Sequence, residues 1–149
     1  MNRSTETIAR PRVIIADDNV MILEKVGMLL EPDFEVVAAV SDGVALLEAV
    51  LAFKPQIGVI DISMPRMGGI EAVRQLKSEG SEMLVIFLTV HEDPDFVRAA
   101  FDSGASAYLI KSRMVTELLR AVRSALKGEA FISPCFPLNE TELPVNSAD

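Results

Sequence analysis

Short runs of consecutive apolar residues alternate with longer amphipathic segments along most of this chain. The short runs are rich in Val and Ile and are apolar at successive positions, which is typical of strands buried on both faces of a sheet. Five such runs are predicted as strands, at residues 13–17, 35–40, 57–61, 84–89 and 107–110. Their continuous apolar character favours a parallel sheet that is covered on both sides.

The segments between these runs have the 3.6-residue apolar spacing of helices. The first helix is predicted to stop at Pro32, the second to begin after Ser41–Asp42, the third to span about 69–78, the fourth to be capped by Asp93, and the fifth to bury Val115, Leu118, Leu119, Val122 and Leu126 on one face. Five strand–helix units in series predict an α/β fold, a doubly wound five-stranded parallel sheet with five helices. The flavodoxin-like strand order 2-1-3-4-5 is the expected topology.

The predicted elements fill one domain, residues 12–128. Residues 1–11 are polar and predict an N-terminal arm. Residues 129–149 contain several prolines and predict a linker or C-terminal tail, which begins with a short ordered piece at Phe131–Ile132.

Composition narrows the class of partner. The 149 residues carry a formal net charge of −8, and such an acidic surface is a poor general binder of nucleic-acid phosphates but suits metal cations or basic partner surfaces. The single cysteine, the polar N-terminus and the lack of a long apolar run favour a cytoplasmic protein without membrane contact.

Polar residues with complementary chemistry follow the predicted strands. Asp17 and Asp18 follow the first strand, Asp61 the third, Thr89 the fourth and Lys111 the fifth. The carboxyl ends of parallel strands meet at one edge of a sheet, so we expect three carboxylates to crowd one crevice where strands one and three are neighbours. A divalent cation such as Mg²⁺ relieves that repulsion, and Lys111 and Thr89 add a cation and a hydroxyl. These groups are what phosphoryl transfer to a carboxylate requires.

The same motifs carry a family resemblance. The pair in IIADDN, Asp61 in VIDISMPRMGG, Thr89 in FLTV, and Tyr108 with Lys111 in AYLIK resemble a CheY-like response-regulator receiver domain over roughly residues 12–127. The run YLIKSRMVTELLRAVRSALKGEAFISP resembles the receiver of NarL/FixJ-type two-component regulators, whose helix-turn-helix DNA-binding domain is not within this chain.

The resemblance implies a role for each residue. Asp61 is the expected phosphoacceptor, Lys111 its ion-pair partner, and Thr89 and Tyr108 the switch residues. The expected Mg²⁺ ligands are Asp17, Asp18, Asp61 and the backbone carbonyl of Ser63.

The function predicted from this resemblance is a phosphorylation switch. A sensor histidine kinase or phosphotransfer protein would donate the phosphoryl group, and the output would be transcription, through a phosphorylation-dependent homodimer or a DNA-binding domain outside this chain. The chain is predicted not to be an enzyme beyond self-phosphotransfer and slow autodephosphorylation. The alternatives are a metal-dependent phosphohydrolase, which Ser63 disfavours because that class has an acid at this position, a flavodoxin-like cofactor binder, a pseudo-receiver, and a stand-alone receiver that relays phosphate or binds partners. His91 is interpreted as a solvated loop residue.

Overall fold

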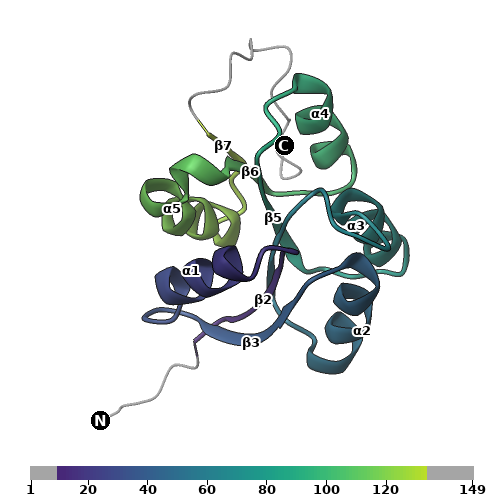
Figure 1. The fold of residues 1–149 in the computed structure, drawn as a ribbon, viewed down its shortest axis with the longest axis horizontal. Coiled ribbons are helices and arrows are strands. Elements are labelled where there is room, and N and C mark those ends of the chain that lie inside the picture. Colours follow the sequence, from purple (N-terminus) through teal and green to yellow (C-terminus); the bar gives the residue numbers. More distant parts are fainter. Residues whose placement is uncertain (1–9, 134–149) are drawn as a thin grey trace.

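A parallel sheet of six strands forms the centre of the computed structural model, which describes residues 10–133 (Figure 1). The strand order is β3-β2-β4-β5-β6-β7, and every adjacent pair is parallel. The strands are β2 (Arg12–Ala16), β3 (Glu35–Val40), β4 (Ile57–Ile60), β5 (Leu84–Thr89), β6 (Ala107–Ile110) and β7 (Phe131–Ile132). The labels follow Figure 1, in which the first described strand is β2.

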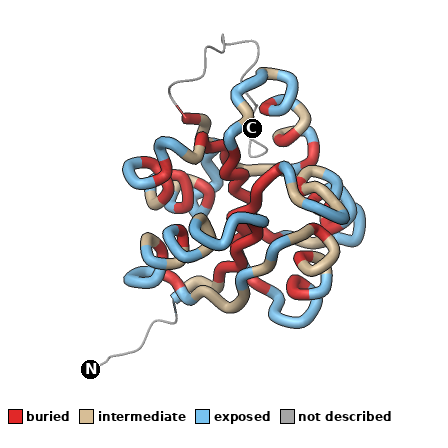
Figure 2. Tube along the Cα trace, viewed as in Figure 1, coloured by how far each residue is buried: buried red, intermediate tan, exposed pale blue. Residues whose placement is uncertain are grey.

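Helices cover both faces of this sheet. They are α1 (Val20–Leu30), α2 (Gly43–Phe53), α3 (Gly69–Ser78), α4 (Pro94–Asp102) and α5 (Met114–Leu126), with a 3₁₀ turn η1 (Lys111–Arg113) before α5. In Figure 1, α1 and α5 lie on one side, and α2, α3 and α4 lie on the other. Two apolar clusters match this division, one between the sheet and α1 and α5, the other between the sheet and α2, α3 and α4. Figure 2 shows the buried positions concentrated along the central strands.

Capping residues make the helices begin shortly after the strands end. The side chain of Asn19 accepts hydrogen bonds from two backbone N–H groups of α1, and Asp42 caps α2 in the same way. Asp93 caps α4, whose first residue is Pro94. Because the sheet is parallel, these caps lie at the edge formed by the carboxyl ends of the strands, where the predicted site residues also lie.

The predicted α/β class, doubly wound topology, strand order and five helices are confirmed. The expected count of five strands is corrected to six, because the short ordered piece at Phe131–Ile132 joins the sheet beside β6 as β7. The predicted buried face of α5 also needs correction, since Val115 and Leu126 are 62% and 43% exposed. The helix packs instead through Met114, Leu118, Ala121, Val122 and Ala125.

Two further sequence predictions concern regions at the limits of the described chain. The arm and most of the tail, residues 1–9 and 134–149, lie outside the described residues. Within residues 10–133, every helix is too short or too polar to cross a lipid bilayer.

Candidate functional site

Three aspartates meet at the carboxyl ends of two neighbouring strands. Asp17 follows β2 and Asp61 follows β4, and these strands are paired so that Ala16 lies opposite Ile60. Asp17 and Asp61 are buried, at 2% and 5% exposure, whereas Asp18 is exposed. One carboxylate oxygen from each of the three lies within 4.8 Å of the others. The structure therefore brings together the acidic trio that the sequence predicts.

Lys111 approaches the trio from η1, which directly follows β6. Its Nζ lies 2.7 Å from Asp17 Oδ2 and 3.1 Å from Asp61 Oδ2, and its side chain is only 14% exposed. A single ammonium group thus contacts both buried carboxylates. The sequence separation of 50 positions between Lys111 and Asp61 is closed entirely by the sheet topology.

Burial and charge act in opposite directions on these groups. Burial raises the pKa of the Asp61 carboxyl above its ordinary value; the negative charge of Asp17 adds to this, while Lys111 opposes it. Burial on its own would lower the pKa of Lys111, but the hydrogen bond to Asp17 and the charges of both carboxylates outweigh it and raise this pKa. Lys111 therefore stays charged, and Asp61 is a carboxylate whose negative charge is only partly compensated.

The donor set fits a hard divalent cation. Carboxylate oxygens are the ligands that Mg²⁺ prefers, and the exposed Asp18 leaves one side of the cluster accessible to water, which Mg²⁺ retains in most protein sites. Three ionised carboxylates and one ammonium leave two negative charges, which one divalent ion would balance. Asp18 is available for this role because Asn19, and not Asp18, is the N-cap of α1.

The two predicted switch residues are connected through the backbone of His91. Thr89 is fully buried at the end of β5, and its hydroxyl accepts a hydrogen bond from His91 N at 3.3 Å. Tyr108 is fully buried in β6, and its hydroxyl donates to His91 O at 3.0 Å. Burial raises the pKa of Tyr108, with Asp61 and Asp93 adding to the effect, so the phenol stays protonated and can donate.

His91 also contacts the loop that follows Asp61, which the sequence interpretation missed. Its Nε2 lies 2.7 Å from Ser63 Oγ, and its ring stacks on Phe96 with 4.4 Å between ring centroids. His91 is half-buried and is not a solvated loop residue. The available signal was its position two residues after Thr89, but the partner Ser63 lies 28 positions away and becomes a neighbour only because β4 and β5 are paired.

The loop after Asp61 is packed too tightly for larger residues. A Cβ atom at Gly69 would lie 2.1 Å from the backbone oxygen of Asp61, and one at Gly43 would lie 2.2 Å from the backbone oxygen of Met67. Glycine is needed at these places because two backbone segments approach closely. The ion pair between Arg66 and Asp42, at 3.1 Å, further fixes this loop against the start of α2.

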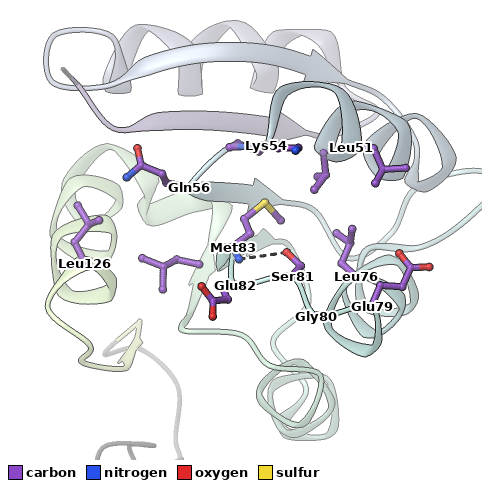
Figure 3. Close-up of a pocket in the computed structure, with 13 residues that line it drawn as sticks. Leu51, Lys54, Gln56, Leu76, Glu79, Gly80, Ser81, Glu82, Met83 and Leu126 are labelled. Atoms are coloured by element: carbon purple, nitrogen blue, oxygen red, sulfur yellow. Dashed lines mark hydrogen bonds between the residues drawn. The ribbon is translucent and has the colours of Figure 1, made fainter.

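A cavity of about 550 Å³ lies at the opposite end of the sheet (Figure 3). Its apolar lining includes Leu51, Leu76, Met83 and Leu126, which belong to or adjoin the ends of helices and the start of β5. It is therefore separate from the acidic trio.

Comparison with known proteins gives a consistent family. The family model described as "Response regulator receiver domain" matches residues 13–123. The transcriptional regulatory protein DegU of Brevibacillus brevis is 36% identical over 125 residues, which cover 83% of this chain and 53% of that protein. LiaR of Bacillus subtilis is 36% identical over 120 residues, covering 79% of this chain and 57% of LiaR. The chain thus spans a little more than half the length of these two curated relatives.

Solved structures agree with the sequence comparison. A LuxR-family two-component response regulator from Aurantimonas sp. SI85-9A1 superimposes with a TM-score of 0.80 at 31% identity, covering 85% of this chain and 91% of that one. The signal receiver domain of a NarL response regulator from Mycobacterium tuberculosis gives a TM-score of 0.78 at 30% identity, covering 82% of this chain and all of that one.

Proposed function

The chain belongs to the response regulator receiver domain family, and from this premise we propose that Asp61 accepts a phosphoryl group from a histidine kinase or phosphotransfer protein in the presence of Mg²⁺. The observation that carries the proposal is the contact of one Lys111 ammonium with both Asp61 and Asp17 beside the exposed Asp18. This arrangement gives a buried nucleophile a fixed positive charge and leaves an open, acidic side.

The residues of the site divide the chemistry between them. The carboxylate of Asp61 attacks phosphorus, and the bond from phosphorus to the donor's nitrogen or oxygen breaks, with its electron pair leaving on the donor. Lys111 holds positive charge beside the oxygens that carry the transferred group. Asp17, Asp18, Asp61 and the carbonyl of Ser63 would hold Mg²⁺, which supplies charge neutralisation for the incoming phosphoryl oxygens.

The response is proposed to pass through the β5–α4 loop. A phosphoryl group on Asp61 offers new acceptor oxygens to the hydroxyl of Thr89. Movement of Thr89 toward them alters its bond with His91 N, and His91 O is the acceptor for Tyr108. Thr89 and Tyr108 therefore change together, because they bind opposite ends of one residue.

The output is proposed to be control of transcription, as the curated relatives DegU and LiaR are transcriptional regulators. DNA contact would come from parts of such proteins that this chain does not span, and phosphorylation-dependent homodimerisation is the proposed link. We place the protein in the cytoplasm, with no catalytic activity beyond self-phosphotransfer and slow autodephosphorylation. Relay of the phosphoryl group to another protein is the alternative output.

The test is phosphorylation of the full chain with acetyl phosphate and Mg²⁺, followed by intact mass. Wild-type protein and the control Asp102→Asn, an exposed aspartate at the end of α4, should each gain one phosphoryl group. Asp61→Asn should gain none, and omission of Mg²⁺ should abolish the gain. An adduct that persists in Asp61→Asn would contradict the assignment of the phosphoacceptor.

A further inference from the structure

Strand β7 lies beyond the segment that the receiver family model matches, which ends at residue 123. It runs parallel to β6, with Phe131 beside Ala107 and Ile132 beside Tyr108. The guanidinium of Arg120 lies over the ring of Phe131, 5.6 Å from its centroid. The last described part of the chain therefore forms the outer neighbour of the strand that carries Tyr108 and leads into Lys111 (Figure 1).

Ser133, the residue after β7, forms three hydrogen bonds at the end of β6. Its N–H donates to Tyr108 O at 3.0 Å, and its hydroxyl oxygen accepts from Ile110 N at 3.2 Å. The same hydroxyl donates to Glu117 Oε1 at 2.6 Å. Ser133 is 1% exposed, so it fixes the backbone on both sides of Leu109, immediately before Lys111.

Glu117 makes this contact specific. It is a carboxylate on α5 with 1% exposure, and its other oxygen accepts from Arg113 Nε at 2.5 Å. A buried carboxylate is costly unless its oxygens are hydrogen-bonded, and one of these partners is the hydroxyl of Ser133. Displacement of β7 would therefore leave an oxygen of Glu117 and the N–H of Ile110 to find new partners.

We propose that Ser133 is a positioning residue that couples the docking of β7 to phosphorylation of Asp61, an inference that rests on the proposed function. Docked β7 sets the end of β6, and this end sets where Lys111 meets Asp61 and where Tyr108 meets His91. Coupling between two sites is reciprocal, so occupancy of the Asp61 site changes the docking of β7 and the direction in which the chain leaves Ser133. The competing interpretation is that β7 only covers the edge of the sheet.

The experiment compares three variants of the full chain with wild type. Ser133→Ala removes the hydroxyl, and Ser133→Thr restores it. Ser103→Ala is the matched control, because Ser103 is another buried serine whose hydroxyl is hydrogen-bonded, to Ala100 O at 2.6 Å, but it lies at the end of α4 before β6 begins. The rate of phosphorylation by acetyl phosphate with Mg²⁺ is measured for each, and thermal unfolding establishes that each is folded.

We expect Ser133→Ala to react about three- to tenfold more slowly than wild type, the effect of losing hydrogen bonds that hold Lys111 in place. Ser133→Thr and Ser103→Ala should stay within about twofold of wild type. A folded Ser133→Ala variant that reacts at the wild-type rate would overturn the positioning role.

The reciprocal arm uses wild-type protein only, so it decides the question even if a variant fails to fold. Amide hydrogen exchange of residues 129–133 and 107–110 is followed with and without beryllofluoride and Mg²⁺, which mimic the phosphorylated state. Coupling predicts a change of at least about threefold in the exchange of both segments. Beryllofluoride binding without any change at residues 129–133 would overturn the coupling and leave the proposed function intact, whereas absence of binding and of phosphorylation at Asp61 would overturn both.

Discussion

Replacement of Lys111 by methionine removes the ammonium group that contacts Asp17 and Asp61 at 2.7 and 3.1 Å and keeps a side chain of similar length. Both carboxylates are almost fully buried, so the change leaves two like charges facing each other in a poorly solvated site. Loss of one partner from a buried ion pair typically costs 3–5 kcal/mol, and the lower end applies here because exposed Asp18 opens the site to water. We therefore expect a loss of about 3 kcal/mol in the free energy of unfolding, or about 10 °C in Tm.

The assay is thermal unfolding at pH 7 in the presence and absence of Mg²⁺. The ion is the remaining source of positive charge for the trio in Lys111→Met, so Mg²⁺ should raise Tm more in this variant than in wild type. The double variant Lys111→Met/Asp61→Asn, which also removes one negative charge, should recover at least half of the lost stability. Lys25→Met, a change at an exposed lysine of α1, is the control and should unfold near the wild-type temperature.

Two results would refute this reasoning. The first is a Lys111→Met variant that unfolds at the wild-type temperature, since the carboxylates would then need no counter-charge. The second is a double variant less stable than Lys111→Met, since Asp61 would then stabilise the fold by itself.

Two further predictions concern the loop that follows Asp61 and the helix beside it. Gly69→Ala should lower the free energy of unfolding by about 1–3 kcal/mol and abolish phosphorylation, because the new Cβ displaces the Asp61 backbone; Gly27→Ala, in α1 with no neighbour within 4 Å of the new Cβ, should instead raise it by about 0.5–1 kcal/mol, and urea unfolding distinguishes the two. The hydrogen bond from Ala45 N and the charge of Arg66 hold the pKa of Asp42 below 3.8, so its ionised form stabilises the fold above that pH and this contribution is lost as pH falls through the lowered pKa. Asp42→Asn keeps the helix cap without the charge, so its Tm deficit relative to wild type should be present at pH 6 and close below pH 3.8; a deficit that is constant with pH would contradict this.

Local patterns in the sequence were sufficient for the main architecture. Consecutive Val and Ile residues identified each of the five long strands, and caps such as Asp93–Pro94 located the helix starts, because both signals depend on neighbouring residues. The trio of Asp17, Asp18 and Asp61 was also predictable, since the end of a parallel strand can be identified in sequence and the strand order brings two such ends together.

The contacts that sequence did not predict are those between side chains far apart in the chain. Nothing near Ser63 indicates that its hydroxyl meets His91, and nothing near Glu117 indicates that Ser133 will be its partner. The sixth strand escaped prediction as a strand because two residues carry no periodicity, and its place depends on the exposed edge of β6. The exposure of Val115 likewise depends on how α5 is rotated against the sheet, which its apolar spacing leaves open.

The order of the strands also has a consequence for folding. The centrally placed β2 comes from the start of the chain, whereas Lys111, which contacts the residue after β2, comes from near its end. Contacts between such distant residues form slowly in parallel sheets, because long loops must close first. A chain still being synthesised would hold Asp17 and Asp61 without their lysine, so it should be unable to accept a phosphoryl group until β6 has joined the sheet. Competence for signalling would then coincide with the completion of folding, and partly folded molecules would be silent in the pathway.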